Sequence, residues 1–223
     1  MTPLQKYGLW LIIFSAASVI SQYGSTIPFS LGTWFGIDVW LPLSAITVIP
    51  LLDVGRSFVQ HYAEQAEVPF RKTLFHMLTI PTTVAFFCSW KAGLPYPIFL
   101  GAIVAVNVGG YIDIRVFRWV RFISEKPHVR MRFSNAVATA SGSLAFFLIA
   151  FTNWPVALGL PTNDLAKSWD MITVGIIAQA CTIWVAGIVM AHIIAWLIER
   201  LESDDREDTV AAEVSAQSLS EAD

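Results

Sequence analysis

Hydrophobic residues along the chain are gathered into six long runs, and short polar or basic segments separate them. Each run supplies the roughly 20 mainly apolar residues that an α-helix needs to cross the hydrocarbon core of a bilayer. The pattern therefore predicts six transmembrane helices, at residues 7–23, 39–58, 73–90, 97–120, 133–152 and 172–198. The predicted fold class is an all-α integral membrane protein whose transmembrane domain covers residues 1–200.

The first run has an alternative interpretation as a signal peptide, because Lys6 precedes it and small residues follow. It is long for the apolar part of a signal peptide, and five further runs come after it. We interpret it as an uncleaved transmembrane helix.

Composition agrees with a membrane location for most of the chain. Hydrophobic residues make up 55% of the chain and charged residues 14%, whereas about 25% of the residues in a typical soluble domain are charged. The segment 201–223 differs, since it carries eight acidic residues, one arginine and no aromatic residue. Segments of this kind bury too little apolar surface to fold alone. We therefore predict a disordered acidic tail over residues 201–223.

Basic residues predict how the bundle is oriented in the membrane. Twelve of the 14 lysines and arginines fall at or near one side of the predicted bundle, and only Lys91 and Lys167 fall on the other. Cytosolic loops carry an excess of lysine and arginine. Both termini and the acidic tail are therefore predicted to face the cytosol, in agreement with an even number of spans.

The sequence lacks the motifs of soluble enzymes. Cys88 and Cys181 fall in predicted spans, the four histidines lack metal-ligand spacing, and no phosphate-loop, dinucleotide, nucleophile-elbow or zinc-protease motif is present. We therefore expect no enzymatic activity, cofactor or metal. Topology explains the basic segment 121–132, so nucleic acid is not an expected partner. The expected partners are the lipid bilayer and a small-molecule substrate, and a homo-oligomer stays open.

Charged residues inside the fourth predicted helix are the first candidates for function. The stretch "GGYIDIRVFRWVRF" holds Asp113, followed by Arg115, Arg118 and Arg121. Snorkelling toward anionic headgroups explains the arginines, but it does not explain the carboxylate. An unpaired aspartate at the bilayer centre costs about 2.5–3.5 kcal/mol. Asp113 is therefore expected to form a salt bridge with Arg115 or Arg118, or to face the bundle interior in a substrate or coupling role.

Other predicted helices carry a smaller set of polar candidates. Asp53 and Arg56 lie three residues apart in "VIPLLDVGRSFVQ", on one face of the second helix. Asp53 reaches a depth similar to that of the first aspartate, which hints at an internal repeat. Asn107, Asn135 and Gln179 fall within spans, either as interhelical hydrogen bonds worth about 0.6 kcal/mol or as binding groups. The small residues of "NAVATASGS" are predicted to allow close helix packing.

The segment "YIDIRVFRWVR", followed by "SNAVATASGSLAFFLIAF", resembles the vitamin-uptake-type family of queuosine precursor transporters. The matching positions are Asp113, Val116, Phe117, Val120 and Arg121, then Asn135 and 145–151, with Asp53 as the counterpart of an aspartate in the second helix. The resemblance covers about residues 41–197 and is strongest over 109–151. The chain departs from the family at Gly142, where members usually have aspartate, and at Gln179, where some have lysine.

The resemblance implies a six-helix importer in a bacterial inner membrane for 7-cyano-7-deazaguanine or 7-aminomethyl-7-deazaguanine. A carboxylate of Asp53 or Asp113 would accept the N1–H and exocyclic amino group of the base. The other predicted substrate-binding residues are Arg56, Asn107, Asn135 and Gln179 for polar contacts, and Phe117 or Trp119 for stacking.

Three other functions stay open. The chain is an importer of another purine-like or vitamin compound, a substrate-binding module for an ATP-driven partner, or a structural protein whose Asp–Arg pairs only hold helices together.

Overall fold

The computed structural model describes the backbone of residues 1–124 and 127–220 and most side chains as far as Arg200. Within this part, six helices are long and apolar enough to cross a membrane. They are α1 (Pro3–Gly24), α2 (Leu43–Gln65), α3 (Phe70–Lys91), α4 (Tyr96–Val120), α5 (Pro127–Ala150) and α7 (Trp169–Ser220), and α6 (Trp154–Ala157) is a single turn. Each of the six predicted spans therefore overlaps one of these helices. The predicted bounds lie within seven residues of the observed ones, except at the end of the sixth, which was placed at residue 198 and lies at Ser220.

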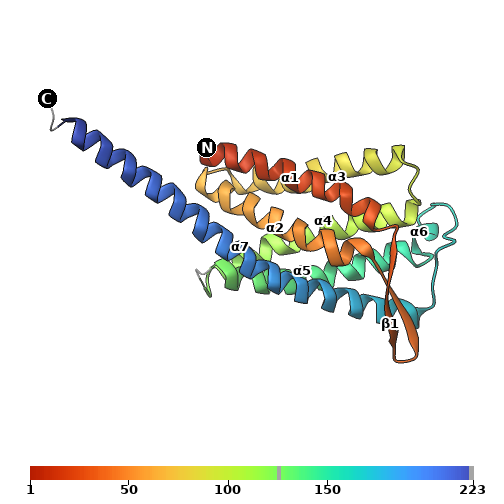
Figure 1. Cartoon of the computed structure of the whole chain (residues 1–223). Coiled ribbons are helices and arrows are strands. Elements are labelled where there is room, and N and C mark those ends of the chain that lie inside the picture. Colours follow the sequence, from red (N-terminus) through yellow and green to blue (C-terminus); the bar gives the residue numbers. More distant parts are fainter. Residues whose placement is uncertain (125–126, 221–223) are drawn as a thin grey trace.

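The contacts between the six long helices define a closed ring, and Figure 1 shows the bundle from the side. Each helix packs against two neighbours in the order α1, α2, α7, α5, α4 and α3, and α3 returns to α1. Long helices that follow one another along the chain run in opposite directions (Figure 1). Met1, residues 66–69 and Arg121 therefore share one end, called the basic end here. Residues 25–42, 92–95 and 151–168 share the other, called the hairpin end.

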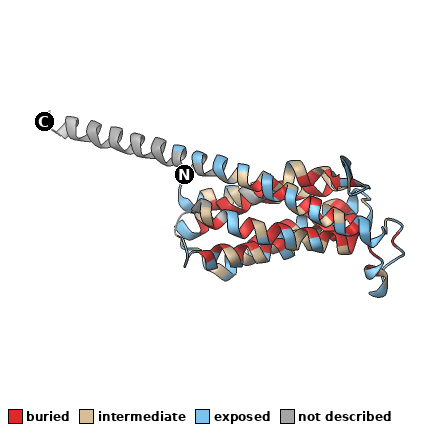
Figure 2. Ribbon diagram, turned by 90° about the horizontal axis from the view of Figure 1, so that it is seen from below, coloured by how far each residue is buried: buried red, intermediate tan, exposed pale blue. Residues whose placement is uncertain are grey.

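Burial follows the ring. Buried residues concentrate on the faces that the helices turn toward one another, and exposed residues cover the outside (Figure 2). Large apolar side chains such as Phe87, Trp90 and Val185 are exposed on that outer surface. Exposed apolar area of this extent marks a surface that meets lipid or a partner. An apolar outer surface agrees with helices that are long enough to cross a membrane.

A β-hairpin interrupts the helical fold at the hairpin end. Strands β1 (Pro28–Trp34) and β2 (Ile37–Pro42) pair antiparallel, and Trp34 faces Ile37. The two turn residues, Phe35 and Gly36, have φ angles of 52° and 78°, as a two-residue type I′ turn requires. The all-α prediction is wrong here, and so is the predicted start of the second helix at Val39. That segment alternates buried and exposed positions, which is the pattern of a strand packed on one face.

Helix α7 is longer than the hydrophobic pattern predicts. It continues to Ser220, whereas a disordered tail was expected from residue 201, and residues 221–223 lie outside the described part. No glycine or proline follows Gly187. Half of residues 201–220 are alanine, glutamate, leucine, arginine or glutamine, which favour helix. A helix that has already formed extends through such a segment at little cost, and it projects beyond the bundle (Figure 1).

Glycines bring α4 and α5 into direct backbone contact. A Cβ added at Gly109 would lie 3.0 Å from the carbonyl oxygen of Ala138, and one at Gly142 would lie 3.3 Å from that of Ala105. Small residues at four-residue spacing allow this approach between membrane helices. The prediction that "NAVATASGS" permits close packing is confirmed.

Candidate functional site

A buried ion pair crosses the inside of the ring. Arg56 lies on α2 and Asp113 on α4, two helices that are not adjacent in the ring. Their side chains meet with Nη1 of Arg56 3.4 Å from Oδ2 of Asp113, and the two side chains are 6% and 4% exposed. The predicted inward orientation of Asp113 is therefore confirmed. Its predicted alternative partners, Arg115 and Arg118, are wrong.

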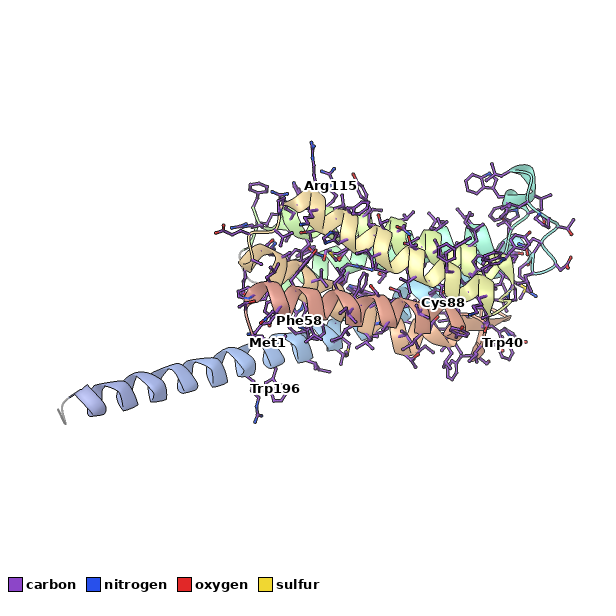
Figure 3. The ribbon with its side chains drawn as sticks, turned by 90° about the horizontal axis from the view of Figure 1, so that it is seen from above. Met1, Trp40, Phe58, Cys88, Arg115 and Trp196 are labelled. Atoms are coloured by element: carbon purple, nitrogen blue, oxygen red, sulfur yellow. The ribbon has the colours of Figure 1, made fainter. Side chains whose placement is uncertain are left out.

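Helix geometry explains why the arginines on α4 itself do not reach Asp113. Residues two positions apart on a helix do not share a face, so Arg115 points away from the carboxylate and projects from the bundle (Figure 3). Its guanidinium lies 5.3 Å from the ring centre of Tyr111. Arg118 lies over Phe70 of α3, at 4.5 Å. Both arginines are exposed and stack on aromatic rings, as cations do at a membrane interface.

Arg56 reaches across the ring past Gly110 of α4. A Cβ at Gly110 would lie 3.8 Å from Nε of Arg56 and 3.9 Å from its Cζ. On the opposite side, the guanidinium carbon lies 5.9 Å from the ring centre of Phe14 on α1. The arginine is thus held between an aromatic ring and the bare backbone of α4.

The ion pair does not satisfy the aspartate completely. The contact of 3.4 Å is long for a charge-assisted hydrogen bond, which is normally near 2.7–2.9 Å. Oδ1 of Asp113 is buried and has no hydrogen-bond partner among the described residues. A buried carboxylate oxygen without a donor costs free energy. The arrangement therefore leaves an acceptor available inside the bundle.

A small central cavity adjoins Arg56. Its volume is about 60 Å³, room for a few water molecules. The lining residues come from four helices and include Arg56, Gly109, Thr139, Gly142, Ser143 and Gln179. Two lining atoms, Oγ of Ser143 and Oε1 of Gln179, are buried without a hydrogen-bond partner in the described part of the chain. The cavity therefore presents several polar groups to a small ligand or to water.

Three of the predicted site residues line neither this cavity nor the ion pair. Asn107 turns toward α3, where its amide donates to Oγ1 of Thr82 at 2.6 Å. The side chain of Asn135 packs against Gly187 of α7. Phe117 is buried in the core, and the guanidinium carbon of Arg130 lies 3.9 Å from its ring centre.

The remaining predicted residues divide as follows. Trp119, the other stacking candidate, is 63% exposed. The side chain of Asp53 lies outside the described residues. Arg56, Asp113 and Gln179 are thus the predicted residues that the structure brings to the centre. Ser143 was not predicted as part of it, although its spacing of four residues from Thr139 places both on one face of α5.

A second and larger pocket lies at the hairpin end. Its volume is about 480 Å³, and strand β2, the start of α4, the end of α5 and the start of α7 surround it. Its lining is mostly apolar and includes Trp40, Phe147 and Phe151, with Asp38 and Lys167 as its two charged residues. None of these is among the predicted site residues, because no pattern in the sequence brings the hairpin, the end of α5 and the loop before α7 together. The larger pocket and the buried ion pair thus lie in different parts of the bundle.

Together, these features define a polytopic helical membrane protein with a polar centre and an open pocket at one end. No protein-family model, no curated protein and no solved structure matches the chain. The likeness to the queuosine precursor transporters therefore stays a prediction from the residues. Gly142 also has a packing role, because an aspartate there would meet the backbone of α4 at the present spacing.

Proposed function

We propose that this protein is a membrane transporter and that the ion pair between Arg56 and Asp113, with the cavity beside it, forms its central substrate site. One observation carries the proposal: a buried carboxylate oxygen without a hydrogen-bond donor lies in a bundle that also holds unpaired atoms of Ser143 and Gln179 at a cavity. Ionisable residues inside membrane bundles mark substrate or ion pathways more often than they serve packing.

The same chain shows what purely structural packing looks like. At the α4–α5 contact, Gly109 and Gly142 bring two backbones together without any charged group. A bundle that needed only helix association had this apolar solution available. The central ion pair carries a desolvation cost that apolar residues of similar volume avoid. Its presence therefore favours a role in binding.

The proposed substrate class follows the resemblance. A 7-deazaguanine base presents an N1–H and an exocyclic amino group side by side, and the Asp113 carboxylate accepts both. The amide of Gln179 can donate or accept at another ring edge. A bicyclic base is larger than a cavity of about 60 Å³, so binding requires the helices around the cavity to separate. We propose that the described conformation has a closed centre.

The membrane and the energy source complete the proposal. It places the chain in a bacterial inner membrane with both termini in the cytosol. The sequence contains no nucleotide-binding motif, and an intramembrane carboxylate can carry a coupling proton. Proton-coupled uptake is therefore the proposed mechanism. Uptake that continues unchanged after a protonophore is added would exclude proton coupling from the mechanism.

The test is uptake in a strain unable to make or import queuosine precursors. The wild-type chain should restore queuosine-modified transfer RNA when a 7-deazaguanine precursor is supplied. Asp113→Asn and Arg56→Gln should abolish this rescue, while Arg118→Gln, an exposed change of the same charge, should not. Rescue by Asp113→Asn at the wild-type rate would contradict the central site. If the wild-type chain restores no queuosine-modified transfer RNA with any precursor, 7-deazaguanine bases are excluded as its substrates.

A double variant separates transport from helix association. The exchange Arg56→Asp with Asp113→Arg restores a pair of opposite charges in the reverse order. A purely structural pair would tolerate the exchange, and uptake would return. A binding role requires the carboxylate on α4, so the exchanged protein should fold and stay inactive.

A further inference from the structure

The pocket at the hairpin end has the size and composition of a small-molecule site. Its volume of about 480 Å³ lies within the range of about 300–1,000 Å³ that is usual for ligand pockets. Such pockets combine mostly apolar walls with a few polar groups that fix orientation. Here the wall is apolar and aromatic, and Asp38 and Lys167 are the charged groups.

These two charges and the aromatic wall suit one ligand chemistry. The indole of Trp40 and the ring of Phe151 offer flat apolar faces to a planar ring. The Asp38 carboxylate is an acceptor, and the hydroxyl of Thr33 donates to its Oδ1 at 2.8 Å and orients it. The Lys167 ammonium is a donor. A ring system with adjacent N–H groups on one edge and a carbonyl on another matches both.

The pocket and the central cavity lie one above the other along the same helices. On α5, Phe147 lines the pocket and Ser143 lines the cavity; on α7, Gly175 lines the pocket and Gln179 the cavity. Each pair is four residues apart, or about 6 Å along a helix. A single helical turn therefore separates the two spaces.

The ring of Phe147 packs against α7 at the level of this helical turn. A Cβ added at Gly175 would lie 2.3 Å from Cε1 of Phe147, and the side chain is buried. The ring thus rests directly on the backbone of α7 at the wall of the pocket, one helical turn from Ser143 of the cavity.

From these observations we infer that the hairpin-end pocket is the entry site for an uncharged, planar heteroaromatic lactam and that Phe147 is the barrier between it and the central site. The inference rests on the proposed transport function and adds the first binding step to it. An acyl chain of a lipid is the other occupant that an apolar pocket accepts. The acceptor of Asp38 and the donor of Lys167 in the pocket wall favour the heteroaromatic ligand.

Equilibrium binding to the purified full-length protein in nanodiscs tests the entry site, with 7-cyano-7-deazaguanine as the probe. Asp38→Asn and Lys167→Met should each weaken binding by about tenfold or more, the loss expected for one hydrogen bond to a charged group. Trp40→Ala should weaken it as well. Asp164→Asn and Lys91→Met are matched controls, because both residues are exposed at the same end and neither lines the pocket.

The variants separate failure of the entry site from failure of the function. Asp113→Asn should still bind the probe while losing uptake. Unchanged affinity in Asp38→Asn and Lys167→Met, together with uptake that still needs Asp113, would overturn the entry site and leave the transporter. No binding and no uptake by the wild type would overturn both. A co-purified lipid that the probe cannot displace would also overturn the entry site.

Thiol labelling tests the barrier. In a background of Cys88→Ala and Cys181→Ala, Ser143→Cys should react slowly with a water-soluble thiol reagent while Phe147 is present. Adding Phe147→Ala should raise the labelling rate by about tenfold or more, the change that removal of a barrier of about 1.4 kcal/mol produces. Phe147→Leu keeps the core filled and should give an intermediate rate. Equal rates in all three proteins would overturn the barrier.

Discussion

The two ends of the bundle use different side chains to cap the C-terminal carbonyl groups of their helices. At the basic end, Nε of Arg130 donates to the carbonyl oxygen of Phe117 near the C-terminus of α4, at 3.1 Å. At the hairpin end, the amide of Asn163 donates to the carbonyl oxygens of Ala150 and Thr152 where α5 ends, at 3.0 and 2.7 Å. Both side chains satisfy carbonyl groups that a helix end leaves without partners. A cation does this at one end and a neutral amide at the other.

The cationic closure at the basic end also ties three helices together. The guanidinium of Arg130 on α5 lies over the ring of Phe117 on α4, and its Nη2 lies 3.6 Å from Oε1 of Glu64 on α2. That distance allows ion pairing but not a hydrogen bond, and Nη2 is among the buried atoms without a hydrogen-bond partner. Burial lowers the pKa of Arg130, and the Glu64 carboxylate opposes that shift. An arginine keeps its charge under these conditions.

Among the described residues of the hairpin end, no charged side chain ties three helices together, and this end contains the larger pocket. Its pocket of about 480 Å³ lies between the hairpin and the starts of α4 and α7. A pocket at this end is what the proposed transporter would need for access from one side. In the proposed orientation, the open end faces away from the cytosol. Variants that weaken one end at a time test this comparison.

The largest effect is expected from the hairpin end. Leu41 on β2 is 1% exposed and packs in the core that joins the hairpin to α4, α5 and α7. Leu41→Ala should reduce the free energy of unfolding by about 2–5 kcal/mol, measured as thermal stability in detergent. Ile27→Ala, at a half-exposed position of the same loop, is the control. Equal stability of the two variants would mean that the hairpin does not hold this end.

A somewhat smaller effect is expected from the basic end. Arg130→Met keeps most of the side-chain length but removes the charge, the hydrogen bond to Phe117 and the ion pair. The loss should be about 1.5–3 kcal/mol, the range for hydrogen bonds to charged groups. The variant should also expose the basic end to limited proteolysis. Arg121→Met, at an exposed position, should change neither property, and a similar loss there would show that charge alone matters.

The neutral cap should be weaker than the cationic one. Asn163→Ala removes three neutral hydrogen bonds, because Oδ1 of Asn163 also accepts from the backbone N–H of Leu165 at 3.0 Å. Each is worth about 0.5–1.5 kcal/mol. We expect a decrease in stability no larger than that of the arginine variant, because Arg130→Met also removes a cation–π contact and an ion pair, together with higher mobility of residues 151–168 in hydrogen exchange. Asn153→Ala, at an exposed position of the same loop, serves as the control. A larger loss for Asn163→Ala than for Arg130→Met would reverse the ranking of the two caps.

The smallest effect is an expected gain at the tip of the hairpin. Phe35 is 92% exposed and has a φ of 52°, a conformation in which asparagine is much more common than a bulky residue. Phe35→Asn should therefore stabilise the hairpin by about 0.5–1 kcal/mol, seen as slower hydrogen exchange of β1 and β2. Phe35→Ala, which keeps the unfavourable φ, should not give this gain. Faster exchange in Phe35→Asn would show that the ring contributes contacts of its own.

The sequence predicted the helices better than it predicted the contacts between them. Long apolar runs depend on local composition, so all six spans begin within six residues of their predicted positions. The hairpin was missed because Val39 and Leu41 merge with the apolar run that follows them. The partner of Asp113 was missed for a different reason. Arg56 lies 57 positions away along the chain, and only the order of helices in the ring brings the two together.

The ring order also constrains how the protein is made. Helix α7 is the last to be synthesised, and it lies between α2 and α5. Before it inserts, Arg56 and Asp113 can already neutralise each other, because α2 and α4 emerge earlier from the ribosome. The groove that will receive Gln179 stays open to lipid until then. In the nascent chain, the charged groups therefore find partners before the uncharged polar groups do. Truncation before Trp169 would yield a five-helix product in which α2 and α5 lack the helix that lies between them.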